Sequence, residues 1–324
     1  MSRFSEFGNQ LYSGERSLEF VGRRKIFYVI ALVMLVLSVL LPLSRGGFNF
    51  GIEFRGGSEY RISDSKEKST IAAEEAVHTI VPNIQVNTTE IGGDTIRVQT
   101  PQLSDVDSEK VRLALAKKFD VPDSNVASSF IGPNWGADIT SKALFGLVVF
   151  VALAAVLMAL YFRTLKMSIA AVVALLHDLV ITAGLYGAFG FEVTPAAVIG
   201  FLTILGYSLY DTVVVFDKIR ENTLETEYSE TATFAERVNL AINQTLVRSI
   251  NTSVVAVLPV AAILFIGAFI LGAGTLRDIS LALFIGIVVG TYSTIFIAAP
   301  LYSQLREGES KFRKQAEKVL AKRA

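Results

Sequence analysis

Six long apolar runs restrict this chain to folds that cross a membrane. A helix needs about 20 consecutive apolar residues to span the hydrocarbon core of a bilayer. The runs near that length are Ile26–Leu43, Ala143–Phe162, Ser168–Gly190, Thr194–Phe216, Ser253–Ala273 and Ile279–Tyr302. The first follows a mostly polar segment and lacks a small-residue cleavage site, so we expect it to remain as an anchor. The sequence therefore predicts a polytopic α-helical membrane protein.

Composition argues against several other classes of protein. The 30 basic and 30 acidic side chains cancel, and nothing in that balance suggests a nucleic-acid partner. Because the chain has no cysteine, it has no disulfides, no thiol catalysis and no thiolate metal site. His78 and His177 form no HExxH pattern, and no GxxxxGK[ST] motif for ATP occurs. We therefore expect no metal, no cofactor and no enzymatic activity.

The basic residues of the short connections predict the orientation, since Lys and Arg are enriched on the cytoplasmic side of membranes. Five precede the first span, two fill the turn after the second, and seven follow the sixth. The links 191–193 and 274–278, on the opposite side, contain a single basic residue, Arg277. We therefore expect a cytoplasmic N-terminal segment at residues 1–25 and a basic cytoplasmic tail at residues 304–324.

Residues 44–142, between the first two spans, consist of amphipathic segments bounded by turn signals. Alternation of apolar and polar residues predicts strands, and helical periodicity predicts helices, the first with Ser69 as its N-cap. The expected order is strand 58–63, helix 69–81, strand 83–91, a turn at 92–94, strand 95–100, helix 108–119 and strand 125–131. This β-α-β-β-α-β order is typical of a ferredoxin-like α+β domain. The predicted topology places it outside the cytoplasm.

Residues 143–303 contain the second to sixth spans and one long cytoplasmic loop, 217–252. Within this loop, Ala232–Leu246 has apolar residues near one helix face. The favoured interpretation is a helix that lies on the membrane surface. Contact with a cytoplasmic partner is the alternative.

Ionisable residues within the spans are the strongest candidates for function, because burying charge in a membrane is costly. Only Asp178 and Asp211 lie within the apolar runs. Tyr207 and Ser208, four and three residues before Asp211, share its helix face and offer hydroxyls for proton exchange. The alternative is a hydrogen-bond clamp between helices. Asp178 is a candidate for a relay or for local hydrogen bonding, and its neighbour His177 is expected to point elsewhere, since adjacent helix positions diverge by roughly 100°.

A cation is expected near Asp211, since an isolated charge at membrane depth is unfavourable. Arg248 is the nearest candidate in the sequence. It lies in the polar stretch 243–253, which leads into the fifth span and also contains Asn251 and Thr252. Asp211 and Arg248 would meet if the fourth and fifth spans pack together. Alternatively, Arg248 extends to the lipid headgroups.

Small residues in the last span predict close helix packing. Gly286 and Gly290 form a GxxxG pattern. Such a pattern lets two helix backbones approach each other. It supports a helical bundle without indicating a function.

Several segments together resemble the SecF family, the membrane subunits of the bacterial SecDF accessory complex of the protein translocase. Residues 206–222 are similar to its GYSxxDTVVVFDRIREN signature, with Tyr210 at a usual Asn and Lys218 at a usual Arg. Residues 243–253 are similar to NQTLxRTxNTS, and residues 285–300 to the GxxxGTYSS element.

Two further matches flank the α+β domain. Before it, residues 48–57 resemble the GIDFxGG element, with Glu53 where Asp is usual; the other matching positions are Gly51, Phe54, Gly56 and Gly57. After it, residues 131–136 are similar to VGPxVG, with Trp135 as a departure. The resemblance covers essentially the whole chain.

The resemblance implies an RND-type half-transporter in the bacterial cytoplasmic (inner) membrane. It would use the proton-motive force to assist late stages of protein export. The implied partners are a SecD-like six-span subunit, the SecYEG translocon, YajC-like and YidC-like membrane proteins, exported unfolded polypeptide and membrane lipid. Asp211 and Arg248 correspond to the proton-path residues of the family, with Tyr207, Ser208, Asn251 and Thr252 as further candidates beside them. The competing interpretations are a passive scaffold of the translocase and half of an RND exporter of small molecules or lipids.

Overall fold

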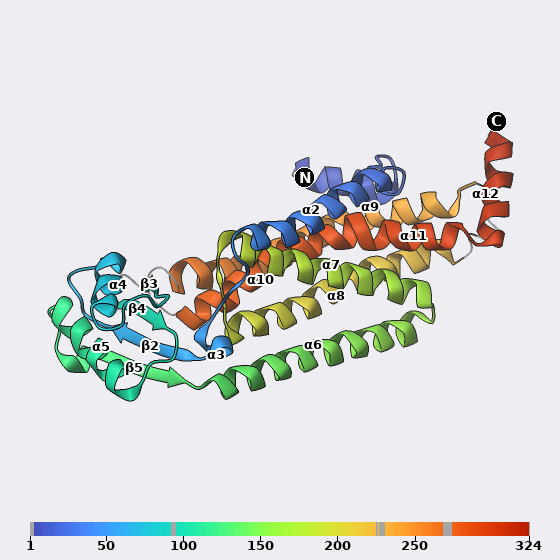
Figure 1. Cartoon of the computed structure of the whole chain (residues 1–324). Coiled ribbons are helices and arrows are strands. Elements are labelled where there is room, and N and C mark those ends of the chain that lie inside the picture. Colours follow the sequence, from blue (N-terminus) through green and yellow to red (C-terminus); the bar gives the residue numbers. More distant parts are fainter. Residues whose placement is uncertain (1–2, 92–94, 225, 227–230, 268–273, 324) are drawn as a thin grey trace.

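The computed structural model describes residues 3–91, 95–224, 226, 231–267 and 274–323. Six helices in these ranges are long and apolar enough to cross a membrane. They are α2 (Arg24–Ser44), α6 (Pro133–Phe162), α7 (Leu165–Phe189), α8 (Pro195–Thr223), α9 (Phe234–Ala262) with the π-helical turn η3 (Ile263–Gly267), and α10 (Gly274–Ser293) continued by the π-helical turn η4 (Thr294–Ala298) and α11 (Ala299–Glu307). They form one elongated bundle with an α+β domain at one end and α12 (Ser310–Arg323) at the other (Figure 1). The predicted fold class is confirmed.

Local sequence signals set the ends of the membrane helices. After α7, Gly190 adopts a φ of 72°, a left-handed conformation that glycine takes without strain. Thr194 then caps α8, and Pro195 occupies the first helical position. α9 begins with a capping box between Thr233 and Glu236. Each signal satisfies or removes backbone groups that would otherwise lack partners at a helix end.

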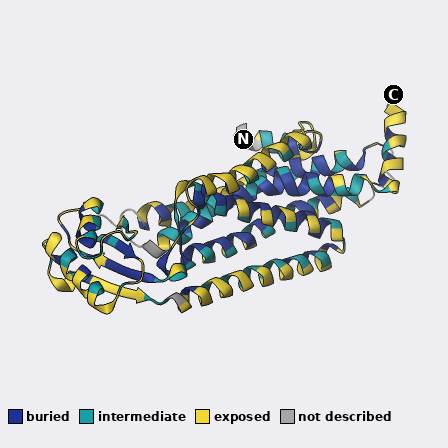
Figure 2. Ribbon diagram, viewed as in Figure 1, coloured by how far each residue is buried: buried dark blue, intermediate teal, exposed yellow. Residues whose placement is uncertain are grey.

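The helices differ in how deeply they lie in the bundle. In α7 and in the last span, 56% of the most apolar window is buried, against 11% in α6. Figure 2 shows long exposed faces on α2 and α6. α7 and α10 therefore form the interior, and the outer helices present apolar side chains to lipid or to another protein.

The α+β domain has the predicted order of elements. Its elements are β2 (Gly57–Ile62), α4 (Thr70–His78), β3 (Asn87–Ile91), β4 (Thr95–Thr100), α5 (Asp105–Lys118), a short 3₁₀ turn η1 (Asp123–Asn125) and β5 (Val126–Ile131). The strands form one antiparallel sheet in the order β3-β4-β2-β5. The turn expected at residues 92–94 lies outside the described residues.

Two serines set the start of the domain helices. Ser69 caps α4 by accepting a hydrogen bond from Ala72 N at 3.1 Å, as predicted. α5 begins before the expected residue 108, because Ser104 caps it by accepting a hydrogen bond from Asp107 N. The two helices and the sheet share a core whose central residues are fully buried: Tyr60, Ile62, Val98, Val111 and Leu115. This core is the domain's own, and it is separate from the core of the bundle.

A second, two-stranded sheet connects the domain region to the membrane helices. β1 (Asn49–Phe50) pairs in parallel with β6 (Glu192–Val193), the short link between α7 and α8. α3 (Ile52–Arg55) follows β1 directly. β1, α3 and β6 were not predicted from the sequence. Strands of two residues carry no alternation to detect.

The expectation of a helix lying on the membrane surface at residues 232–246 is wrong. α9 runs without a break from this segment into the fifth span. Its apolar face is buried inside the protein: Phe234 and Val238 are 2% and 0% exposed. Contacts with α11 and with the N-terminal helix α1 (Arg3–Ser13) cover α9. The apolar stripe therefore has a protein partner and does not need lipid.

Two asparagines of α9 hold the segment that follows α1. Asn239 Oδ1 accepts hydrogen bonds from the backbone N–H groups of Phe20 and Val21, at 2.8 and 3.1 Å. One helical turn later, Asn243 Oδ1 accepts from Leu18 N at 2.8 Å. Both asparagine amides also donate to Leu18 O, at 3.0 Å each. The polar side of α9 therefore contacts residues 18–21 and does not face solvent.

Candidate functional site

The interior of the bundle contains hydrogen-bonded polar side chains from α7, α8, α9 and the last span. Two of them are acids, Asp178 on α7 and Asp211 on α8, with 0% and 2% exposure. We call the set the polar layer; it comprises Asp178, Tyr207, Ser208, Asp211, Thr212, Ser249, Ser253, Thr291, Ser293 and Thr294. Polar groups at membrane depth need partners within the protein, since lipid offers none.

Among the described residues, Asp211 accepts one well-formed hydrogen bond, and the side chain of Thr294 lies near enough to interact with its carboxylate. Its Oδ1 accepts from Ser249 Oγ of α9 at 2.8 Å. Its Oδ2 is buried, with no hydrogen-bond partner among the described residues. A bare carboxylate oxygen inside a membrane is costly. Oδ2 therefore offers a place for a proton.

Asp178 is much better satisfied than Asp211. Its Oδ2 accepts from Ser208 Oγ of α8 at 2.6 Å and from Ser293 Oγ of α10 at 2.8 Å. Its Oδ1 lies 3.2 Å from Nδ1 of His177. The expectation that His177 points away from Asp178 is wrong. The two side chains leave the helix in different directions, but the imidazole is long enough to reach the carboxylate. Asp178 thus joins three helices, and its role as a relay stays a prediction.

Direct hydrogen bonds do not connect the two hydroxyls expected beside Asp211 to its carboxylate. Ser208 donates to Asp178 instead. Tyr207 OH donates to Ser253 Oγ at 3.1 Å, and Ser253 Oγ lies 2.5 Å from Thr291 Oγ1 in the last span. The α8 hydroxyls therefore join α8 to α7 and α9, and Ser253 extends the link to the last span.

The last span changes its helical geometry within the polar layer. η4 begins at Thr294, whose Oγ1 lies 3.0 Å from Thr212 Oγ1 of α8. A π-helical turn is rare and is often found at functional positions. It rotates the following residues relative to a regular α-helix, so the two halves of the span present different faces to α8.

Among the described residues, Arg248 forms no ion pair with Asp211, although its charge is near enough to favour the carboxylate, so its place in a proton path stays a prediction. α8 and α9 pack together, as the expectation required, but Ser249 rather than Arg248 contacts the carboxylate. The side chains of Arg248 and Asn251 are exposed, and Thr252 Oγ1 donates to the backbone oxygen of Arg248 at 2.8 Å. Sequence reasoning missed Ser249, although it follows Arg248 directly, because packing sets the rotation of α9 about its axis.

Glycines allow α10 to approach α8 closely. A Cβ at Gly286 would overlap the side chain of Ile204. A Cβ at Gly290 would lie 3.0 Å from Cβ of Ser208. Gly290 thereby leaves space for the serine that bonds to Asp178.

The glycine-rich segment before the α+β domain lies where the domain meets the bundle. Gly51 N donates to Val193 O of β6 at 2.9 Å, and Gly51 then caps α3. Gly56 ends α3. Gly57 has a φ of 147°, and a Cβ there would overlap the backbone oxygen of Thr100. Only glycine fits the close approach of β2 to β4 at this point.

Glu53 and Phe54 of α3 lie where the α+β domain meets the bundle, a region that we call the joint, and their side chains have different surroundings. The Phe54 ring packs against Phe50, with centroids 6.0 Å apart. Burial raises the pKa of the Glu53 carboxyl above its ordinary value of 4.5, and the carboxylates of Glu192 and Glu59 raise it further. Glu53 Oε2 is buried without a hydrogen-bond partner among the described residues.

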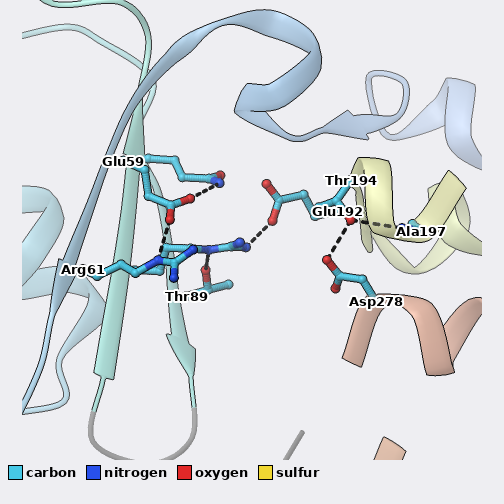
Figure 3. A network of polar contacts seen from close by, with 9 residues as sticks. Glu59, Arg61, Thr89, Glu192, Thr194, Ala197 and Asp278 are labelled. Atoms are coloured by element: carbon cyan, nitrogen blue, oxygen red, sulfur yellow. Dashed lines mark hydrogen bonds and ion pairs between the residues drawn. The ribbon is translucent and has the colours of Figure 1, made fainter. Parts of the chain in front are cut away.

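Charged side chains connect the two faces of the joint (Figure 3). Arg97 of β4 forms an ion pair with Glu192 of β6. On the bundle side, Thr194 Oγ1 donates to Asp278 Oδ2 of α10 at 2.8 Å. A cavity of about 440 Å³ lies between the domain and the bundle, lined by Glu53, Arg97, Asp278 and their neighbours. Within the described ranges, no group of three or more His, Asp or Glu side chains is arranged to hold a metal ion.

The raised pKa of Glu53 predicts a pH dependence of stability. The folded state holds a proton on Glu53 more readily than the unfolded chain does. Protonation of Glu53 therefore contributes fully to the free energy of unfolding below the ordinary pKa of 4.5, and this contribution is lost as pH rises through the raised pKa. Glu53→Gln should therefore raise the melting temperature at about pH 8 and change it little at about pH 4. Melting in detergent measures both, with the exposed Glu67→Gln as control. A larger gain at the acidic pH would contradict the prediction.

Comparison with known proteins covers both the polar layer and the joint. Residues 112–308 match the family described as "Protein export membrane protein SecD/SecF, C-terminal", and residues 45–63 match "SecD/SecF GG Motif". The protein translocase subunit SecF of Streptomyces coelicolor is 44% identical over 329 residues, which cover 100% of this chain and 86% of that protein. This chain belongs to the SecF family.

Two further similarities agree with membership of the SecF family. SecF of Mycobacterium tuberculosis strain CDC 1551 is 40% identical over 328 residues, covering 98% of this chain and 73% of that protein. The crystal structure of SecDF from Thermus thermophilus matches with a TM-score of 0.77 and 30% identity. That match covers 90% of this chain and 39% of the SecDF chain. The polar layer lies within the larger family match, and Gly51 to Gly57 lie within the smaller one.

Proposed function

We propose that this SecF-family chain uses the proton-motive force to assist late stages of protein export, with Asp211 as the proton-binding residue. The observation that carries the proposal is the bare, buried Oδ2 of Asp211. A proton on this oxygen removes a buried negative charge, and its departure restores the charge. The site needs no ATP, metal or cofactor for this step, and we propose no enzymatic reaction.

Protonation of Asp211 would change a contact between helices. Oδ1 accepts the hydroxyl of Ser249, and a hydrogen bond to a charged acceptor is roughly twice as strong as one between neutral groups. The contact between α8 and α9 is therefore stronger when Asp211 is charged. Two states of different helix packing, each favoured by one protonation state, are enough to convert proton movement into a conformational change.

The proposed partner is a SecD-like six-span subunit. The matched SecDF chain is much longer than this one, which covers 39% of it. α9 carries an exposed polar pair, Arg248 and Asn251, next to the exposed Val255 and Leu258. Polar groups on an outer helix face at membrane depth fit contact with another protein better than contact with lipid. The SecYEG translocon and exported polypeptide, with YajC-like and YidC-like proteins, complete the proposed assembly.

We place the chain in the bacterial inner membrane with both termini in the cytoplasm. Ser128 of β5 and Ser310 of α12 are exposed, and the chain has no native cysteine. In intact cells, Ser128→Cys should react with an impermeant thiol reagent and Ser310→Cys should not, because the positive segments stay inside. Labelling of the Ser310 site at the rate of Ser128 would overturn this orientation.

Export measured with and without an uncoupler tests the proposed function. Inverted membrane vesicles would contain either the wild-type protein or Asp211→Asn at matched abundance. Asparagine cannot bind and release a proton in the physiological range. The second candidate function, a passive scaffold, is favoured by the hydrogen bond from Ser249, which by itself clamps α8 to α9. A scaffold would support equal uncoupler-sensitive export in both preparations.

A further inference from the structure

An apolar cavity lies between α6 and the rest of the bundle, at the end near the α+β domain. It has a volume of about 180 Å³. α6, α7 and α8 supply most of its lining, and β1, α3 and β6 supply the rest. In Figure 1, α6 runs along the outside of the bundle, and α3 lies near its beginning. The cavity shares no residue with the polar layer or with the charged cavity at the joint.

The lining offers hydrocarbon and no free polar side chain. Thr140 has the only polar side-chain atom among the lining residues, all of which lie in the described part of the chain. Its Oγ1 already donates a hydrogen bond to the backbone oxygen of Gly136 at 2.9 Å. An apolar cavity of about 150 Å³ excludes water and accepts small hydrocarbons. The cavity is therefore suited to an apolar occupant.

The cavity lies where the membrane-spanning part of the bundle meets the joint. Its walls include Leu144 of α6, Leu179 of α7 and Phe201 of α8, all within membrane-spanning helices. Phe50 and Phe54 add aromatic rings from β1 and α3, outside the spans. Leu144 and Phe50 are 59% and 41% exposed, so the cavity is open at the protein surface. The surroundings of the spans are lipid, and an acyl chain can enter from them.

A cation lies beside the opening. Lys142 is exposed and stands between the lining residues Thr140 and Ala143 on α6. Its side chain forms no ion pair or hydrogen bond with any other described residue, and the exposed Asp138, one turn earlier, is likewise unpaired among them. A lysine at the edge of the hydrocarbon region extends its ammonium group toward the lipid headgroups. Lys142 is therefore placed to meet a lipid phosphate.

We propose that the cavity holds one acyl chain of a phospholipid whose phosphate lies beside Lys142. The chain fills the space between α6 and α8 and packs against Phe54 of α3. α3 approaches α6 closely here, since a Cβ at Gly136 would overlap the backbone oxygen of Phe54. The lipid therefore supports the contact between α6 and the joint. An apolar protein segment would fill the same lining but would leave Lys142 without an anion. The proposal does not rest on proton coupling.

Fluorescence quenching by brominated lipid tests the proposal in the full-length protein. Trp135 is the only tryptophan of the chain, so Trp135→Phe gives a background without one. In this background, Phe201→Trp puts a reporter in the cavity lining, at a position that is 8% exposed. Leu153→Trp puts a second reporter on the exposed side of α6, outside the lining. Both proteins are reconstituted in phosphatidylcholine, either plain or brominated on its acyl chains.

We expect brominated lipid to quench both reporters, because bromine quenches tryptophan at close range and an acyl chain in the cavity brings it to residue 201. Ala143→Leu narrows the cavity and should weaken quenching of the Phe201→Trp reporter about threefold, with no change at Leu153→Trp. Ala152→Leu, at an exposed position of α6 outside the lining, is the matched control and should change neither signal.

Two results would overturn the cavity as the site. They are a Phe201→Trp reporter that stays unquenched, and equal effects of Ala143→Leu and Ala152→Leu. Leu202→Trp, also in the lining, repeats the measurement if Phe201→Trp does not fold.

Brominated diacylglycerol tests the role of the phosphate, since it has the same acyl chains without that group. At equal mole fraction in plain lipid, brominated phosphatidylcholine should quench the Phe201→Trp reporter about threefold more strongly than diacylglycerol. Lys142→Gln should remove this preference, and Lys117→Gln, at an exposed position of α5, should keep it. Equal quenching by the two lipids without either lysine substitution would overturn the assignment to phospholipid. Relief of quenching by an added apolar peptide would assign the cavity to a protein segment instead.

Discussion

Asp211→Asn is expected to abolish the uncoupler-sensitive part of export while leaving the abundance of the protein near that of the wild type. Asparagine has nearly the volume of aspartate and can accept the hydrogen bond from Ser249 through its amide oxygen. It cannot alternate between a charged and a neutral form. The contact between α8 and α9 would persist, and its dependence on the proton would be lost. Translocation into inverted vesicles measures the effect.

Asp178→Asn provides the informative comparison, because it makes the same chemical change in the other buried acid. Asp178 accepts from Ser208 and Ser293 and lies beside His177, so neutralising it weakens three contacts at once. We expect lower abundance and melting temperature, with uncoupler sensitivity retained in the protein that folds. The reverse pattern, with coupling lost in Asp178→Asn and retained in Asp211→Asn, would contradict the proposal and show that Asp178 binds the proton.

Gly286→Leu should cause a large loss of stability. The new side chain would occupy the position of Ile204 and push α10 away from α8. Overpacking of this kind costs about 1–3 kcal/mol or more. For a chain of this size the loss corresponds to a fall in melting temperature of about 2–5 °C. The displacement would also separate Ser208 from Ser293, which both bond to Asp178.

Gly146→Leu is the matched control for this substitution. Gly146 lies in the middle of α6, and a Cβ there meets nothing within 4 Å. The same change should therefore leave the melting temperature nearly unaltered. Equal falls in both variants would show that leucine itself, rather than the contact between α8 and α10, is responsible.

The sequence predicted the elements that depend on local patterns. Each span is a run of apolar side chains, and the length of such a run is visible without knowing its neighbours. The α+β domain was predictable for a similar reason, since alternation, helical periodicity and the cap at Ser69 are all local. The two buried acids were also visible, because a charge within an apolar run is conspicuous.

Features that depend on distant residues were not predictable. β1 and β6 have two residues each, and only their pairing across the chain makes them strands. The apolar face of residues 232–246 suggested a helix on the membrane surface, whereas this part of α9 packs within the protein and its Asn239 and Asn243 bind the N-terminal segment. The choice of Ser249 over Arg248 depends on the rotation of α9, which packing determines. A one-residue shift turns a helix by roughly 100°, enough to replace a cation with a hydroxyl.

The hydrogen bonds between α9 and the N-terminal segment affect the order in which the chain folds during its synthesis. The backbone N–H groups of Leu18, Phe20 and Val21 find their acceptors 218 to 225 residues later in the chain. A ribosome makes the segment early, yet its hydrogen bonds wait until most of the membrane helices have been translated. The segment therefore docks late in folding. In a nascent chain arrested before α9 it would stay undocked and accessible to proteases and chaperones.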